Sequence, residues 1–408
     1  MMIIPVDLDD KLKTFQYSTA LLELVSRRIN TKTIRGSRIY QAYGRLLYTK
    51  LLSAFPEDHQ GAGREPVFPG VSEQPMTYGL LLSAESLHYR WNRREESKKR
   101  IQKAVMWLLG NNDLDNDGKP GWGLPDAWDA FQDNKLNPAN HPYTITTAIV
   151  LESLLEALAI TEFKSSSLST QILDTIKAVV LRWNNEVWSE SDPHAGYYWY
   201  SPSRDDAFFV INVNSMMIGV QRRLLSQYES IFSASERCFI EANSDAAVKG
   251  IIQQAAFRDS APVWPYIAVP NIFNRDREND LIHHSHILWG LELYRSYGGG
   301  INIPWTTETA LRTLDRFFLK GQFYRFPQDH ALTKRPARLQ GPGLALALQG
   351  RYGKNRTAGD YLSAIDRLYG PFPNLHYLPN DINFYSRQAV HVLYGLSHWL
   401  FRGSVGHR

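Results

Sequence analysis

The sequence contains a single cysteine, Cys238, which excludes intrachain disulfides and zinc sites built from several cysteines. It has no apolar run of membrane-spanning length, and its N-terminus lacks the basic start and long apolar segment of a signal peptide. It also lacks a strong excess of one charge, since 45 Lys and Arg residues stand against 41 Asp and Glu residues. We therefore expect a soluble protein without a membrane span or a nucleic-acid partner. The compartment stays open between the cytoplasm and, where a signal has been removed, the periplasm or the exterior.

Apolar residues recur with helical periodicity along most of the 408 residues, and the helices they predict are of two kinds. Helices of the first kind have one charged face, which is typical of a helix with one solvent-exposed side. They are expected at 95–109, 168–188, 234–256, 307–319 and 357–368, with a further one inside 12–52. Helices of the second kind are apolar all round and therefore buried. They are expected at 77–91, 143–159, 207–225, 281–294, 339–350 and 384–401.

The two kinds of helix alternate along the chain, and an aromatic, proline-containing stretch joins each exposed helix to the next buried one. Such stretches occur, for example, at 122–125 and 197–202. Six buried helices alternating with exposed ones predict an all-α fold, an (α/α)6 toroid with an inner and an outer ring and aromatic loops at the cavity mouth. We expect residues 1–408 to form this one domain, with a frayed tail at 403–408. The alternative is an irregular helical protein made of two bundles.

Polar residues gather where the predicted inner helices begin. In a toroid these starts lie on one face and surround a central cavity, so their side chains are candidates for ligand binding. Two tryptophans and an aspartate of the aromatic loops are expected beside them. The candidates are Trp128, Asp129, Asn140, His141, Tyr143, Asp205, Asp206, Asn214, Trp264, Asp280, His283, His284, Arg338, Gln340, Asn383, Tyr385 and Arg387.

The alternating helices, aromatic crossovers and polar helix starts resemble the (α/α)-toroid carbohydrate-active enzymes. This group contains polysaccharide lyases, six-hairpin glycosidases and the catalytic domain of glucuronyl C5-epimerase. The resemblance covers most of the chain but is one of architecture, and it transfers no catalytic residue by motif. It implies a polysaccharide or oligosaccharide substrate, and the mild positive charge favours an anionic sugar over a neutral one.

Two chemistries fit the predicted cavity. Elimination or epimerisation at a uronate is the favoured one: Asn and Arg groups bind the carboxylate, His141 or His284 removes the C5 proton, and Tyr143 or Tyr385 protonates the leaving oxygen. Glycoside hydrolysis instead needs a pair of carboxyl groups. Candidates for such a pair are Asp129, Asp205, Asp206, Asp280, Glu73 and Asp381. A non-catalytic polysaccharide-binding scaffold and a terpenoid-cyclase-like toroid remain as alternatives.

A loop between two predicted helices concentrates acidic residues. Asp113, Asp115 and Asp117 recur at a spacing of two with a glycine in the sixth position, as in loops that wrap oxygen ligands around Ca²⁺. The twelfth position is Leu124 instead of the glutamate of an EF-hand, so a further ligand such as Asp126 is needed. We predict a structural Ca²⁺ here and no organic cofactor. The alternative is a solvated turn stabilised by the side chains themselves.

Overall fold

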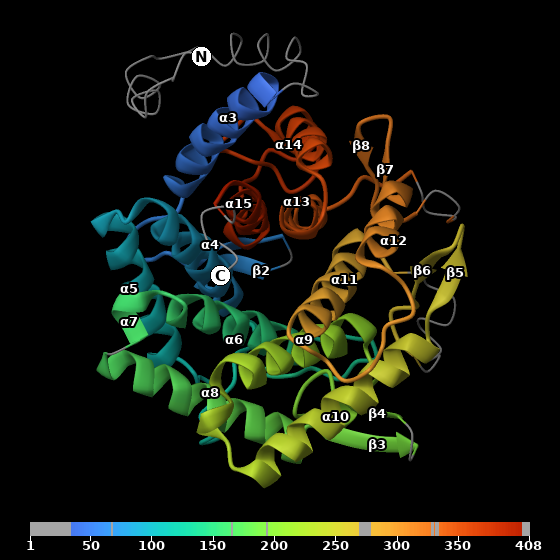
Figure 1. Ribbon diagram of the computed structural model, residues 1–408. Coiled ribbons are helices and arrows are strands. Elements are labelled where there is room, and N and C mark those ends of the chain that lie inside the picture. Colours follow the sequence, from blue (N-terminus) through green and yellow to red (C-terminus); the bar gives the residue numbers. More distant parts are fainter. Residues whose placement is uncertain are drawn as a thin grey trace.

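The computed structural model describes residues 34–401, apart from 67, 165, 193–194, 269–278, 328–329 and 331–333. Its centre is a closed ring of inner helices in which each helix packs against the next and the last packs against the first (Figure 1). The protein is therefore an all-α (α/α)6 toroid, as predicted. In chain order, the inner helices are α4 (Pro75–Asn92), α6 (Thr144–Leu158), α9 (Ile211–Tyr228), α11 (Leu281–Ser296), α13 (Gln340–Tyr352) and α15 (Ser386–Leu400).

The outer ring covers the inner one. Its helices are α3 (Ile34–Leu52), α5 (Glu95–Gly110), α8 (Ser167–Glu186), α10 (Ala234–Gln253), α12 (Thr307–Arg312) and α14 (Asn355–Tyr369). Helix α3 packs against α14 and α15, so a segment from early in the chain completes the layer beside the last helices. The predicted helical residues before 34 and the predicted tail at 403–408 lie outside the described residues. Within the described chain, no helix combines the length and hydropathy needed to cross a bilayer.

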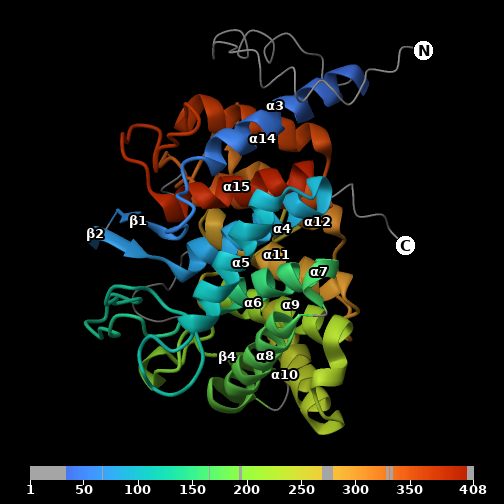
Figure 2. The ribbon, with the colours of Figure 1, turned by 90° about the vertical axis from the view of Figure 1, so that its left-hand side faces the viewer.

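Short β-hairpins occupy four of the outer-to-inner crossovers in the described chain, and the sequence pattern did not predict them. Strands of two to six residues are too short to show a recognisable alternation. Figure 2 shows that β1, β2 and the long loop after α5 project on the same side of the ring, which forms the mouth. The hairpins are β1 (Ala62–Glu65) with β2 (Phe68–Glu73), β3 (Trp188–Asp192) with β4 (Ala195–Tyr198), β5 (Ala256–Arg258) with β6 (Ala261–Val263), and β7 (Phe318–Leu319) with β8 (Gln322–Phe323).

The remaining short elements refine the predicted boundaries. The outer segment expected at 307–319 is helical only as far as Arg312 and continues as the 3₁₀ helix η3 (Thr313–Arg316) before β7. Helix α7 (Thr161–Lys164) links α6 to α8, and the 3₁₀ helices η1 (Arg204–Asp206) and η2 (Glu229–Ile231) flank α9. The inner helix expected to begin at 207 therefore begins at Ile211, after η1 and a short extended segment.

Glycines let neighbouring inner helices approach each other closely. A Cβ atom on Gly290 of α11 would lie 2.0 Å from the carbonyl oxygen of Ser215 on α9, and one on Gly219 would lie 2.4 Å from the carbonyl oxygen of Gly290. Gly343 does the same for α13 and α15, because a Cβ there would lie 2.6 Å from the carbonyl carbon of His391. Any larger residue would push these helices apart. The close approach at Gly343 places the backbone of His391 directly against α13.

The second halves of the inner helices bury a charged network. Arg223 of α9 donates to Glu156 of α6 over 2.7 Å, and the indole N–H of Trp289 on α11 donates to Glu152 over 3.0 Å. Arg351 of α13 reaches Glu152 at 3.7 Å. Because the inner helices begin at the mouth, the network fills the ring on the side away from it. A buried charge is tolerated only when it is paired, and here four inner helices supply the partners.

Candidate functional site

The mouth of the ring opens into a cavity of about 420 Å³. The first turns of the inner helices and the crossover segments form its wall, which is where the helix starts were predicted to meet. Aromatic rings of the crossovers, such as Tyr200, Tyr266 and Phe68, share this wall with polar groups. Seven of the predicted candidates line the cavity: Trp128, Tyr143, Asp280, His283, Arg338, Gln340 and Arg387.

Three predicted catalytic residues do not line the cavity. His284 is buried, its Nε2 contacts Thr313 in the outer layer, and its ring packs against Trp264. Since successive helical residues point about 100° apart, His283 and His286 share the cavity face while His284 points away from it. Tyr385 lies just before α15 and packs edge-on against Tyr377. His141 bonds the Ser201 hydroxyl over 3.1 Å.

The acids proposed as a hydrolytic pair in the crossover loops serve other roles. Asp205 is exposed and pairs with Lys135 over 2.6 Å. Asp206 is buried and accepts hydrogen bonds from the Asn137 amide and the Ser201 hydroxyl, both 2.6 Å. The Asp129 carboxylate accepts from two backbone N–H groups of its own loop, at residues 133 and 134. These three residues fix the loops above the cavity and do not line it.

Four further candidates also lie outside the cavity wall. Trp264 is a core residue, 1% exposed, whose indole N–H bonds a carbonyl of α10 over 2.9 Å. Asn214 is fully buried and holds the strand residue Tyr198 through two backbone bonds. Asn140 has a φ of +65°, a left-handed conformation that asparagine tolerates in turns, and Asn383 is exposed. The buried amide of Asn214 therefore serves structure, because it satisfies backbone groups.

The charged groups in the wall form two ion-pair systems, and one further arginine, Arg338, has no acidic partner in the wall. Glu65, carried in by β1, holds Arg387 bidentately at 2.8 and 2.6 Å. Asp280, the N-cap of α11, contacts His283 Nδ1 at 2.7 Å and Arg325 Nε at 3.2 Å. Burial alone would raise the pKa of Asp280, but His283 and Arg325 hold it well below its usual range. Both wall carboxylates are therefore paired with an arginine.

Two histidines line the cavity from two different inner helices. His286 lies on α11 and His391 on α15, two inner helices that are separated in the ring by α13. Burial, and then the proximity of His391, lowers the pKa of His286 well below its usual value. Burial lowers the pKa of His391 to about 3, and its Nδ1–H donates to the Arg387 carbonyl over 2.7 Å. Both imidazoles are neutral at pH 7, and Nε2 of His391 carries a lone pair.

Several buried polar atoms of the wall lack a hydrogen-bond partner among the described residues. They are His286 Nδ1, Asn212 Oδ1, Asn279 Oδ1 and Gln388 Oε1. Buried polar groups in folded proteins almost always find a partner. Four such atoms belong to residues of this wall, and each is able to take part in a hydrogen bond with a ligand or with water.

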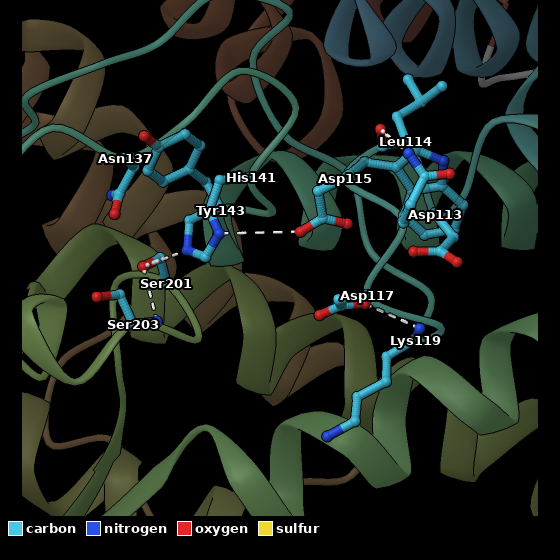
Figure 3. A network of polar contacts seen from close by, with 12 residues as sticks. Asp113, Leu114, Asp115, Asp117, Lys119, Asn137, His141, Tyr143, Ser201 and Ser203 are labelled. Carbon is cyan, nitrogen blue, oxygen red and sulfur yellow. Dashed lines mark hydrogen bonds and ion pairs between the residues drawn. The ribbon is translucent and has the colours of Figure 1, made fainter.

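The acidic loop lies beside this region. Carboxylate oxygens of Asp113, Asp115 and Asp117 lie within 4.8 Å of one another (Figure 3). Oδ1 of Asp113 and of Asp115 has no partner among the described residues, which suits a cation, whereas Asp117 is paired with Arg182 at 2.6 Å. Asp126 does not join this group, and burial followed by the nearby Glu65 raises the pKa of its carboxyl. The predicted Ca²⁺ ligand set is thus reduced to three residues.

Some residues of the cavity wall were not predicted from the sequence, and the reasons can be identified. His391 lies one helical turn after Arg387, so helical periodicity from that candidate could have found it. His286 lies one turn after His283 in the same way. Glu65 and Arg325 gave no signal, because they come from a short hairpin and an irregular crossover whose positions only the fold defines.

No protein-family model and no curated protein matches the sequence. Solved structures do match the fold. A cellobiose 2-epimerase from Bacillus thermoamylovorans is 11% identical over 88% of this chain and 99% of its own, with a TM-score of 0.60. An α-1,6-mannanase from Salegentibacter is 10% identical over the same shares, with a TM-score of 0.54. A reducing-end-xylose-releasing exo-oligoxylanase is 13% identical over 96% and 95%, also at 0.54. At these identities the similarity establishes the toroid fold.

Proposed function

We propose that the protein is a carbohydrate-active enzyme that moves a proton on the carbon next to a sugar carbonyl, as an epimerase or isomerase does. The observation that carries this proposal is the pair of neutral histidines, His286 and His391, which line one cavity from two inner helices. A general base has to be unprotonated at the working pH and within reach of the proton it removes. Both imidazoles meet the first condition, and their place in the cavity wall supports the second.

In this mechanism one imidazole removes the proton from the carbon next to the carbonyl. The electron pair of the broken C–H bond moves towards the carbonyl oxygen, which gives an enediolate anion. Return of a proton to the opposite face of the same carbon gives the epimer, and return to the neighbouring carbon gives the isomer. His391 is suited to the first step, because its Nδ1–H is held by a backbone carbonyl and Nε2 is left as the base. Arg387 uses Nε and Nη2 for Glu65 and keeps further donors for the anion.

The arrangement of carboxylates argues against hydrolysis. A glycosidase needs one carboxyl with a raised pKa as the acid and a second carboxylate as base or nucleophile. The carboxylates in the described cavity wall, Glu65 and Asp280, are both bound by arginine. Two of the similar folds belong to proteins described as a cellobiose 2-epimerase and a sugar epimerase. A proton-transfer reaction of the kind named for these two proteins suits a pair of histidines better than glycoside hydrolysis does.

Elimination at a uronate is the second candidate, because it begins with the same proton removal. It requires a cation for the sugar carboxylate, and the wall offers Arg338. The two outcomes differ in their products: elimination leaves an unsaturated sugar that absorbs in the ultraviolet, while epimerisation and isomerisation leave the absorbance unchanged. Tyr143, whose pKa burial raises to about 12, stays protonated and could donate to the leaving oxygen.

The test is proton exchange with solvent. Sugars incubated with the protein in D₂O should lose the NMR signal of the proton next to the carbonyl, and His391→Asn should slow that loss by about 10²–10⁴-fold. His59→Asn is the matched control, because His59 is exposed and pairs with Glu73 outside the cavity wall. Absorbance and reducing ends are followed in the same samples to detect elimination and hydrolysis. Full exchange by His391→Asn, or product formation only as new reducing ends, would contradict the proposal.

A further inference from the structure

We propose that Arg338 selects sugars that carry an oxyanion, a carboxylate or a phosphate, at the end remote from the carbonyl. The inference deepens the proposed function and rests on it for the reacting end of the sugar. It starts from the charges in the wall, where three guanidinium groups face two carboxylates among the described lining residues. An excess positive charge inside a cavity attracts an anionic ligand.

Arg338 is the guanidinium that lacks an acidic partner. Arg387 is bound by Glu65 and Arg325 by Asp280. Within the described part of the chain, the Arg338 side chain has no ion pair or hydrogen bond, and it leans over the ring of Tyr377 at 5.9 Å. Stacking of this kind holds the planar group without using its N–H donors.

The backbone places this arginine above the two histidines. Arg338 precedes α13, which lies in the ring between α11 and α15 and contacts both. The Leu339 N–H donates to the Tyr377 carbonyl over 3.0 Å, so the segment before α13 is tied to the segment before α15. Arg338 is thereby fixed at the mouth, between the helices that carry His286 and His391.

Chemistry then indicates which ligand fits. A guanidinium group presents parallel N–H donors that match the two oxygens of a carboxylate or phosphate. In a hexuronate or a hexose 6-phosphate, the anionic group sits on the carbon farthest from the carbonyl end. Binding of that group at Arg338 would direct the carbonyl end inward, towards the histidines. Hexuronates and hexose phosphates share this feature, and neutral hexoses lack it.

The test compares three sugar classes in the D₂O exchange assay: neutral aldohexoses, the matching hexuronates and the matching 6-phosphates. Arg338→Gln should lower the exchange rate per enzyme with the preferred anionic class by about 10- to 100-fold, the effect of losing hydrogen bonds to a charged group. Its effect on neutral sugars should be small. Arg335→Gln is the matched control, since Arg335 is exposed three positions earlier and does not line the cavity. Preference for the uronate or for the phosphate identifies which oxyanion is used.

A binding measurement separates this inference from the proposed function. Calorimetry with His391→Asn protein and each sugar class records binding without turnover, and adding Arg338→Gln should weaken binding of the anionic sugar alone. Anion binding that depends on Arg338 without any exchange in the wild type would support the inference and count against the proposed proton transfer. Exchange of neutral and anionic sugars at equal rates, unaffected by Arg338→Gln, would overturn the inference and leave the proposed function standing.

Discussion

Glu156→Gln should destabilise the ring strongly, because it removes one charge from the buried network. Glu156 accepts from Arg223 at 2.7 Å and from Arg90 at 2.6 Å. Removing one partner of a buried ion pair costs about 3–5 kcal/mol, since the remaining charge is left unpaired. An unfolding entropy of about 2.1 cal/mol/K per residue gives roughly 0.9 kcal/mol/K for 408 residues. The melting temperature should therefore fall by about 4–6 °C in differential scanning calorimetry.

Two comparison variants make this prediction specific. Glu162→Gln removes an acid whose pair with Arg93 is about half exposed, so the loss should be at most about 1 kcal/mol. Glu152 lies one turn before Glu156 on α6, and burial raises the pKa of its carboxyl. Burial acts on Glu156 in the same direction, but the nearby arginines outweigh it and lower the pKa of that carboxyl. The charge of Glu152 thus contributes less, and its removal should cost less than that of Glu156. Equal melting temperatures for Glu156→Gln and Glu162→Gln, or a larger loss for Glu152→Gln, would refute the reasoning.

Three further predictions concern the site and its surroundings. Glu65→Gln breaks the pair that orients Arg387, so exchange should fall by at least about tenfold; an unchanged rate would show that Arg387 needs no such support. Buried His284, His286 and His391 have pKa values lowered from 6.5, so their contribution to stability is complete above pH 6.5 and is lost as the pH falls. Each of these histidines should lower the free energy of unfolding by up to about 1.4 kcal/mol per pH unit below pH 6.5. A melting temperature that stays constant from pH 7 to pH 5 would contradict this. Calcium at millimolar concentration should raise the melting temperature of the wild type but not of Asp115→Asn, and an equal response would exclude the acidic loop as the site.

The ring architecture was predictable because it depends on burial, which the sequence encodes directly. A helix with apolar residues all round has to be surrounded, as α6 is, while a helix such as α14 with one charged face has to border solvent. Their alternation therefore predicted the layers and the face on which the inner helices begin. Hairpins such as β7–β8 were missed, since two-residue strands leave no periodic signal.

Most of the candidates that line the cavity stand where a residue's direction follows from helical phase, and Trp128 is the exception in a loop. Asp280, His283, Arg338 and Arg387 stand at or near inner helix starts and do line the cavity. His284, one position from His283, points into the outer layer because one residue along a helix turns the side chain by about 100°. For residues in loops, the sequence does not indicate in which direction the side chain points.

Composition and periodicity by themselves determined that this chain forms a double ring of helices with a polar inner mouth, because burial patterns act locally along each helix. Only the tertiary structure decided which polar groups meet there. Glu65 and Arg387 are far apart in the chain, and His286 and His391 come from helices that are not neighbours in the ring. Pairing between such distant groups depends on how whole elements pack, and the same packing decides which charges are neutralised and which one, at Arg338, remains for a ligand.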